Sequence, residues 1–202
     1  MRAFVIAMQC EADAVRPWLK PDDRLYVSGV GKVNAAAATQ RAICEGADKI
    51  WNVGLCGGFG DDVEVGDFYG VEMACEYDFD LTQINGVSIG VIDGFDTPYM
   101  HCACLPDRPD IPRRILATGD RFNDGKTDHE LIVNVLKASL RDMEGAAIAH
   151  VCKLNHVKCI EFKCVSDVAG GGSMTRQFRD NRERCLAVMS EAMRDILSRS
   201  RI

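Results

Sequence analysis

Residues 159–173 read Cys-Ile-Glu-Phe-Lys-Cys-Val-Ser-Asp-Val-Ala-Gly-Gly-Gly-Ser, and this stretch decides how the fold is interpreted. Its first half has the apolar, β-favouring composition of a strand, and Ser166 and Asp167 follow where that pattern stops. Three glycines and a long amphipathic helix come next. Ligands of open α/β sheets bind beyond the carboxyl ends of the strands. Asp167 is therefore a candidate acid or base, although its position also suits a cap of the following structure.

The composition of the 202 residues is that of an ordinary globular protein, with 47% hydrophobic and 27% charged residues. This length predicts a single domain over residues 1–202. The net charge of -6 argues against a nucleic-acid partner or an anionic membrane surface. No apolar run reaches membrane-spanning length, and the run at residues 3–8 is too short for a secretory signal. We therefore expect a cytoplasmic protein.

The ten cysteines are scattered along the chain and contain no Cys-x-x-Cys pair, which argues against a disulfide framework or a zinc knuckle. One ligand-like cluster, His101-Cys102-Ala103-Cys104, stands out. On a strand His101 and Cys102 would point to opposite faces, and no second ligand pair follows at zinc spacing. The sequence therefore favours buried, reduced thiols over a metal site.

Strand-like and helix-like segments alternate along the chain, which predicts an α/β fold. The expected strands lie at 2–8, 24–28, 50–53, 67–75, 87–93, 114–118 and 159–165, with a short strand that ends at 142–144. The expected helices lie at 12–15, 33–45, 127–136, 145–155 and 175–198. Residues 97–112, which carry four prolines, are expected to form a surface loop that could contact another subunit. The arginines of the last helix alternate with acidic residues, which favours a solvated face over a nucleic-acid site.

Two glycine-rich segments resemble nucleotide-binding loops but lack the required spacing. Gly29-Val30-Gly31-Lys32 is followed by Val33 rather than Ser or Thr, so it fails the phosphate-loop pattern. Residues 54–60 lack the dinucleotide-binding register and lead into Asp61-Asp62 rather than a helix. The glycines at 54–60 would still let the backbone approach a ligand closely.

Three carboxylates, Glu11, Glu144 and Asp167, are placed at the ends of predicted strands, and Phe122 lies in a polar glycine loop after a fourth strand. Charged groups gathered at one edge of a sheet are costly unless a substrate or hydrogen bonds use them. Phe122 could stack on a planar ring or pack against a neighbouring strand. Glu11 could simply interact favourably with the dipole of the helix that it opens. Together they predict an acid–base site for an organic substrate with a flat ring.

Seven segments give the sequence a specific family resemblance. They are Ala-Met-Gln-Cys-Glu (7–11), Ser-Gly-Val-Gly-Lys-Val-Asn-Ala-Ala (28–36), Asn-Val-Gly-Leu-Cys-Gly-Gly (52–58), Val-Gly-Asp (65–67), Gly-Asp-Arg-Phe (119–122), Met-Glu-Gly-Ala-Ala-Ile-Ala (143–149) and Val-Ser-Asp-Val-Ala (165–169). In this order they resemble the nucleoside phosphorylase superfamily, most closely the 5'-methylthioadenosine/S-adenosylhomocysteine nucleosidases. The resemblance implies a nucleoside-phosphorylase-like fold, with a central mixed twisted β-sheet flanked by helices.

The resemblance also implies an activity, which is hydrolysis of the N-glycosidic bond of an adenine nucleoside without a metal or a cofactor. Asp167, helped by Ser166, matches the acid that protonates the purine at N7, and Glu11 matches the base that activates water. On the substrate side, the match places Glu144 on the ribose hydroxyls, Met143 against the sugar and Phe122 on the base. Further substrate-binding positions implied by the match are Cys56, Gly57 and Lys163.

Three alternatives remain open from the sequence. One is phosphorolysis, for which Arg16 and Arg24 could supply positive charge, although a carboxylate such as Glu11 repels a phosphate dianion. Another is a non-catalytic nucleoside-binding relative, because Leu55 and Lys163 stand where the family usually has serine and arginine. The third concerns the substrate: residues 76–114 are shorter than in the family, so a futalosine-type or other nucleoside is possible. Relatives suggest a homodimer.

Overall fold

A computed structural model describes residues 1–105, 108–122 and 126–199. These residues form an eight-stranded mixed sheet with the order β2-β1-β3-β7-β6-β4-β5, in which β8 pairs with both β3 and β4. The strands are β1 (Arg2–Ile6), β2 (Arg24–Val27), β3 (Lys49–Gly58), β4 (Phe68–Glu76), β5 (Met100–His101), β6 (Arg113–Thr118), β7 (Leu140–Asp142) and β8 (Lys158–Val168). The predicted α/β class and mixed sheet are confirmed.

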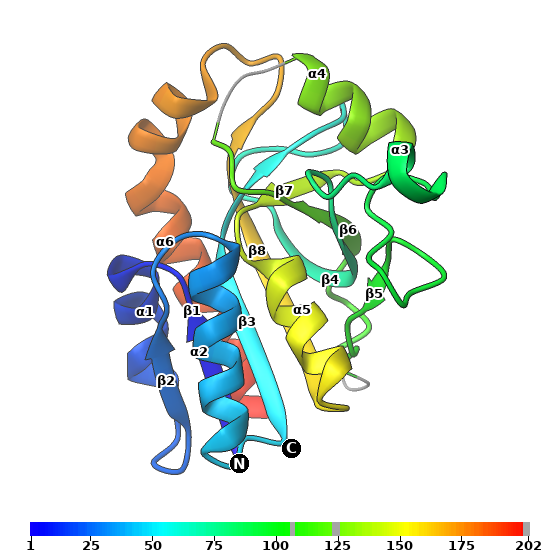
Figure 1. Ribbon diagram of the computed structural model, residues 1–202. Helices are drawn as coiled ribbons and strands as arrows, with labels where there is room; N and C mark the ends of the chain where they lie inside the picture. The colour runs from blue at the N-terminus through cyan, green and yellow to red at the C-terminus, as the bar shows by residue number, and fades with distance from the viewer. Residues whose placement is uncertain (106–107, 123–125, 200–202) are drawn as a thin grey trace.

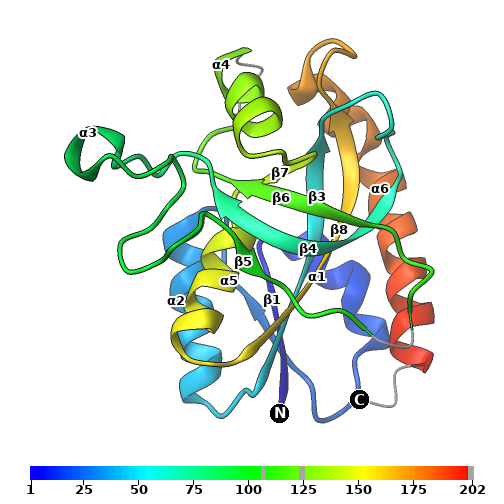
Figure 2. The same cartoon turned by 90° about the vertical axis from the view of Figure 1, so that its right-hand side faces the viewer.

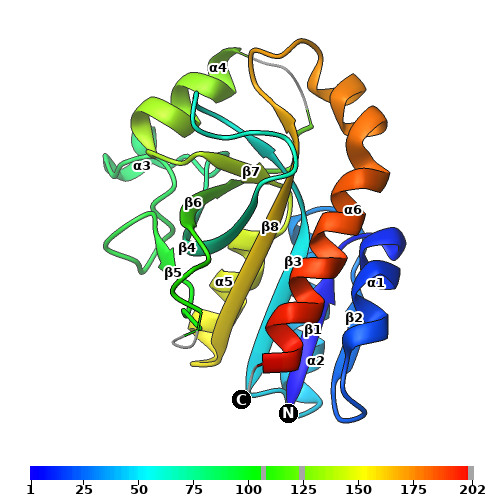
Figure 3. The same cartoon turned by 180° about the vertical axis from the view of Figure 1, so that it is seen from behind.

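Helices cover both faces of this sheet (Figure 1 and Figure 3). They are α1 (Gln9–Val15), α2 (Lys32–Cys44), α3 (Thr82–Asn85), α4 (Lys126–His129), α5 (Gly145–Leu154) and α6 (Met174–Arg199), with short segments η1 (Arg16–Trp18) and η2 (Glu130–Val135). Helices α2 and α5 pack side by side on one face, and α1 and α6 lie together on the other. None of the helices in the described part of the chain is long and apolar enough to cross a membrane.

The two faces follow from the alternation of side chains along the buried strands. In β1, Ala3 and Val5 join the core cluster that contains residues of α2 and α5, whereas Phe4 and Ile6 join the cluster that contains residues of α1 and α6. Strands β3 and β8 run parallel over most of their length. Figure 2 shows β4 and β6 crossing the direction of β3 and β8, so the sheet is strongly twisted. Strands β1, β3 and β8 run parallel to one another, so their carboxyl ends lie at one edge of the sheet.

Two sequence predictions about strands need correction. Residues 87–93 form no strand; α3 precedes them, and Gly86 ends that helix with a φ of 72°. Asn85 and Gly86, a pair that often forms a hairpin turn, therefore end a helix here. Strand β8 also continues two residues past Ser166 to Val168, because it pairs with β3 up to Gly58. Asp167 consequently lies inside a buried strand rather than on a loop.

The cysteines are free thiols, and seven of them are buried, as the sequence predicted. The ligand-like cluster expected around His101 is not assembled as such, since His101 is exposed on β5. Cys102 instead meets Cys159 and Glu161, and their ligand atoms all lie within 4.8 Å of one another. This buried group joins separate parts of the chain, which explains why spacing along the sequence did not reveal it.

Candidate active site

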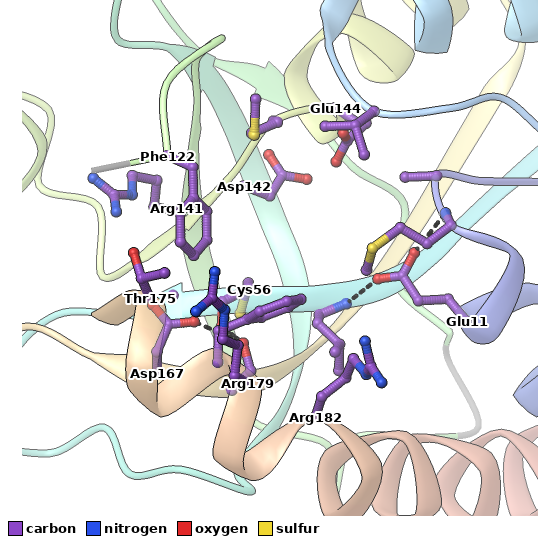
Figure 4. Close-up of a pocket in the computed structure, with 18 of the residues that line it drawn as sticks. Glu11, Cys56, Phe122, Arg141, Asp142, Glu144, Asp167, Thr175, Arg179 and Arg182 are labelled. Carbon is purple, nitrogen blue, oxygen red and sulfur yellow. Dashed lines mark hydrogen bonds between the residues drawn. The ribbon is translucent and has the colours of Figure 1, made fainter. Parts of the chain in front are cut away.

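A cavity of about 580 Å³ lies where β3, β7 and β8 end beneath α6. Its size is in the range of small-molecule sites. Carboxylates on three separate segments line it: Glu11 on α1, Glu144 between β7 and α5, and Asp167 on β8. Figure 4 shows these side chains around one space, with Phe122 and several arginines. The common cavity that the sequence predicted for the three carboxylates is present.

Glu11 is the third residue of α1 and is only 3% exposed. Its Oε1 accepts a hydrogen bond from the Leu55 amide at 2.8 Å, and its Oε2 accepts one from the Met8 amide at 3.0 Å. Gly54 makes this position possible, because a Cβ there would lie 2.9 Å from Glu11 Oε1. Burial raises the pKa of Glu11. A fixed carboxylate with a raised pKa is a good proton acceptor.

Glu144 follows β7 and occupies the N-cap position of α5, without a capping hydrogen bond from its side chain. Its Oε1 accepts a hydrogen bond from the Gly31 amide at 2.8 Å, which ties the tight turn before α2 to the cavity. Burial, followed by the neighbouring charge of Asp142, raises the pKa of Glu144 to about 7. This carboxyl group can therefore accept hydrogen bonds from hydroxyl groups once it is ionised, and neutral pH is close to that transition.

Ser166 and Asp167 form a buried pair at the end of β8. Ser166 Oγ lies 2.7 Å from Asp167 Oδ2 and 3.1 Å from the carbonyl oxygen of Cys56, so its single proton is shared between two acceptors. Gly57 leaves room beside the acid, because a Cβ there would lie 3.1 Å from Asp167 Oδ1. The Ser166 hydroxyl therefore orients the Asp167 carboxyl group, and the Cys56 carbonyl oxygen of β3 holds that hydroxyl in place.

Phe122 lies in the segment after β6, next to α6, and is 46% exposed. Its ring meets that of Phe178 on α6 with centroids 5.7 Å apart and planes at 68°. A ring with this exposed fraction is not part of the hydrophobic core. The alternative that Phe122 serves only to pack against a neighbouring strand is therefore removed. The two rings offer an aromatic wall on which a planar group can stack.

Comparison with known proteins assigns this chain to a family. The model of the phosphorylase superfamily matches residues 24–199. A 5'-methylthioadenosine/S-adenosylhomocysteine nucleosidase of Hydrogenovibrio crunogenus is 32% identical over 164 residues, which cover 72% of this chain and 68% of that protein. The chain belongs to the 5'-methylthioadenosine/S-adenosylhomocysteine nucleosidase family. Within it, an aminodeoxyfutalosine nucleosidase of Campylobacter jejuni is 30% identical over 156 residues, again 72% and 68% of the two chains.

The nucleosidase fold is also found among solved structures. The crystal structure of a putative 5'-methylthioadenosine/S-adenosylhomocysteine nucleosidase from Borrelia burgdorferi, bound to adenine, has a TM-score of 0.88 and 23% identity. The alignment covers 98% of this chain and 99% of that chain. This likeness shows that the fold is shared over nearly the whole length of both chains.

Most of the residues matched to the family line the cavity, but Lys163 does not. Lys163 is 1% exposed and lies behind the wall, where Nζ donates to Asn52 Oδ1 and forms a 2.8 Å ion pair with Asp142 Oδ2. Asp142 itself lines the cavity and accepts the Gly145 amide at 2.8 Å. In this nucleosidase relative, Lys163 therefore holds Asp142 in place instead of forming part of the wall. Leu55 lines the cavity without filling it.

The sequence missed several lining residues that the structure adds. Arg16 and Arg24, considered for phosphate, are not among the residues that line the cavity. The added residues on α6 are Thr175, Phe178, Arg179 and Arg182, and Arg121 and Arg141 come from elsewhere in the chain. Arg179 and Arg182 are exposed to solvent, as the sequence predicted, and they also lie at the rim of the cavity. Their signal was the spacing of three and four residues, which places them on one side of a helix.

Proposed function

We propose that this protein hydrolyses the N-glycosidic bond of an adenine nucleoside such as 5'-methylthioadenosine or S-adenosylhomocysteine. The observation that carries the proposal is the placement of Glu11, Glu144 and Asp167 around one cavity with an exposed aromatic ring. Cleavage of such a bond gives the sugar oxocarbenium character while the base leaves. A base that departs as an anion is a poor leaving group, so the reaction needs an acid, a nucleophilic water and contacts to the sugar.

Asp167 is proposed as the acid that protonates N7 of the purine. Its buried position beside Ser166 Oγ, 2.7 Å away, supports this role, because the hydroxyl fixes the carboxyl group. Phe122 and Phe178 would hold the flat base near Asp167 by stacking. Proton transfer to N7 turns the base into a neutral leaving group, which lowers the barrier to bond cleavage.

Glu11 is proposed as the base that removes a proton from the attacking water. Backbone amides of Met8 and Leu55 fix both carboxylate oxygens, and burial raises the pKa of Glu11. A carboxylate at this position repels a phosphate dianion but attracts a proton of water, which favours hydrolysis over phosphorolysis.

Glu144 and Met143 are proposed to bind the ribose. The carboxylate of Glu144 has one oxygen on the Gly31 amide, and its second oxygen remains available for the sugar hydroxyl groups. Met143 would supply an apolar contact to the sugar face. Cys56 and Gly57 line the floor, where the absence of a side chain at Gly57 lets the ligand approach β3.

The test is release of free adenine from each nucleoside in phosphate-free buffer, followed by chromatography. We expect turnover without phosphate, and a loss on the order of 100-fold to 10,000-fold in Asp167→Asn and in Glu11→Gln. Asp13→Asn is the matched control on α1, because Asp13 is exposed. Turnover that requires added phosphate would contradict hydrolysis. Ligand-induced stabilisation without any base release would instead indicate a nucleoside-binding relative without activity.

We further propose that the protein works as a cytoplasmic homodimer. The exposed apolar side chains of Val30 and Val33 lie where the chain enters α2, and Val30 also lines the cavity. A partner copy that covers them would remove apolar surface from water next to the site. Light scattering of the purified protein tests the dimer, and a monomer at micromolar concentration would contradict it.

A further inference from the structure

A cluster of thiols around one carboxyl group lies in the core, away from the cavity. Three of its side chains have ligand atoms that all lie within 4.8 Å of one another: Cys102, Cys159 and Glu161. Cys159 Sγ lies 3.2 Å from Glu161 Oε1, and the Cys152 thiol forms a hydrogen bond with the Cys159 thiol. None of these four residues, which we call the thiol–carboxyl cluster, is among the described residues that line the cavity. The proposed hydrolysis therefore gives the cluster no role.

Three separate parts of the chain build the thiol–carboxyl cluster. Cys159 and Glu161 are two residues apart on β8, so their side chains share one face of that strand. Cys152 lies on α5, which packs against both β5 and β8. Cys102 directly follows β5, and the next amide, that of Ala103, donates to the Cys159 carbonyl oxygen at 2.7 Å. The backbone therefore holds the four side chains together.

Hydrophobic packing accounts for the thiols of the cluster but not for its carboxyl group. A buried free cysteine behaves as a small apolar side chain. Glu161, in contrast, is 1% exposed, and in the described part of the chain it has no ion pair and its Oε2 has no hydrogen-bond partner. A buried carboxyl group with an unpaired oxygen costs free energy in either protonation state. A cation bound beside Glu161 would pair its charge and remove that cost.

A guanidinium group beside the cluster also lacks a counter-charge. Nη2 of Arg113 donates to the Cys102 carbonyl oxygen at 3.3 Å, which places this cation next to the cluster. Among the described residues Arg113 forms no ion pair, and its buried Nε has no hydrogen-bond partner. Neutral thiols would leave this charge uncompensated. A metal ion held by several thiolates and a carboxylate has a net negative charge, which would compensate it.

The ligand types and their spacing fit a zinc ion. Zinc binds thiolate sulfur and carboxylate oxygen, and its structural sites have four ligands in a tetrahedron. Bonds of the usual length to a tetrahedral zinc ion place the ligand atoms about 3.5–3.8 Å apart. The observed separations, 3.2 Å for Cys159 and Glu161 and up to 4.8 Å within the set of three, lie on both sides of this value. Small side-chain movements would therefore close the cluster around an ion, whereas magnesium and calcium prefer oxygen ligands.

We propose that the protein has a structural zinc site whose four ligands are Cys102, Cys152, Cys159 and Glu161. The ion would join α5, β8 and the segment after β5, and it would stabilise the folded chain because the unfolded chain has no preformed site. The site lies outside the cavity and takes no part in the proposed hydrolysis. The inference is therefore independent of the proposed function.

The test uses the whole chain, purified with a reducing agent and treated with EDTA, which is then removed by dialysis. Zinc alone is added, the bound ion is counted by elemental analysis after gel filtration, and thermal unfolding is followed by circular dichroism. We expect one ion per chain. The Tm should rise by about 5–10 °C when free zinc exceeds its Kd about a hundredfold. Cobalt added in place of zinc should give the near-ultraviolet charge-transfer absorption of thiolate ligands.

Two variants remove ligands, and one serves as the control. Cys159→Ala removes the thiol that contacts two other members of the cluster, and Glu161→Gln removes the carboxylate at nearly constant side-chain size. Each should lose the rise in Tm, and Cys159→Ala should lose the cobalt–thiolate absorption. Cys75→Ala is the matched control, because Cys75 is also a buried cysteine but lies on β4 outside the cluster. If Cys159→Ala does not fold, Cys102→Ala provides the same test, since Cys102 lies outside the regular strands.

Wild-type protein that binds no zinc, or binds it without a rise in Tm, would overturn the inference. Cobalt–thiolate absorption that Cys159→Ala and Cys102→Ala both retain would overturn it as well, because exposed thiols such as Cys44 and Cys104 would then be the ligands. None of these measurements uses adenine release. A failure of the zinc site is therefore distinguishable from a failure of the proposed function.

Discussion

Replacing Glu161 by glutamine is expected to remove a large pH dependence from the stability of this protein. Glu161 lies on β8, is 1% exposed and belongs to no described ion pair. Its Oε1 lies 3.2 Å from Cys159 Sγ, and its Oε2 has no hydrogen-bond partner in the described part of the chain. Burial raises the pKa of Glu161 to about 7, although the charge of Lys163 opposes that rise.

The direction and the magnitude of this pH dependence follow from the linkage between proton binding and folding. The usual value for this carboxyl group is 4.5, so between pH 4.5 and about 7 the folded protein holds a proton that the unfolded chain has lost. Stability contributed by this group is therefore complete below the unfolded value and is lost as the pH rises through the folded value. The gap from 4.5 to about 7 corresponds to about 3 kcal/mol. About 2 kcal/mol of it should disappear between roughly pH 5 and pH 7.5.

Urea unfolding followed by circular dichroism, at several pH values between about 5 and 7.5, measures this effect. The difference in unfolding free energy between the wild type and Glu161→Gln should fall by about 2 kcal/mol across that range, because glutamine cannot ionise. Glu72→Gln is the matched control, since Glu72 is an exposed residue of a neighbouring strand. A difference that stays constant with pH would refute the reasoning and would mean that Glu161 is not buried as described.

Three further predictions concern the cavity and the charges behind it. Because burial raises the pKa of Glu144 to about 7, kcat/KM should fall about tenfold per pH unit below 7, and Glu144→Gln should lack this acidic limb in a pH–rate profile. Lys163→Gln should leave Asp142 unpaired and lower the unfolding free energy by about 3–5 kcal/mol in urea at pH 7, whereas Lys163→Arg should cost less. Gly54→Ala should push the Glu11 carboxylate aside and reduce kcat on the order of 100-fold; an unchanged kcat would contradict the role of Glu11.

The sequence predicted that the carboxylates gather at one edge of the sheet, because each follows a strand that its own local pattern reveals. Strands β1 and β8 run parallel to β3, so Glu11 and Asp167 could be placed at one edge without coordinates. Glu144 follows β7, which runs antiparallel to β3, so this rule alone does not place it. Residues 87–93 show where this reasoning fails. Some of their apolar side chains do pack into the protein, since Val91 is buried and Ile89 contacts the core. In the described part of the chain, however, no strand forms hydrogen-bonded pairs with these residues. Periodicity reports burial on one side and cannot report the missing partner.

The residues that were missed depend on how elements are rotated and packed. Arg179 and Arg182 alternate with acids in the sequence, so nothing local separated them from the solvated arginines of α6. Arg141 belongs to a three-residue strand, and its guanidinium group lies 5.4 Å from the centroid of Phe59. Only the packing of β7 against β3 makes that charge a lining residue. Tertiary arrangement, not composition, decides which charged groups face the cavity.

The charges behind the cavity also explain why its carboxylates are suited to acid–base chemistry. Lys163 is a cation whose charge acts on Asp142, Glu144, Glu161 and Glu11 together. Its direct ion pair is with Asp142, so the other three receive only partial compensation for burial. Burial raises the pKa values of all three, to about 7 for Glu144 and Glu161, so these two keep protons near neutral pH that exposed carboxylates would have lost. An additional cation in contact with these carboxylates would lower their pKa values and weaken Glu11 as a proton acceptor. The charge of Lys163 therefore stabilises the buried carboxylates, but it also lowers the basicity of Glu11.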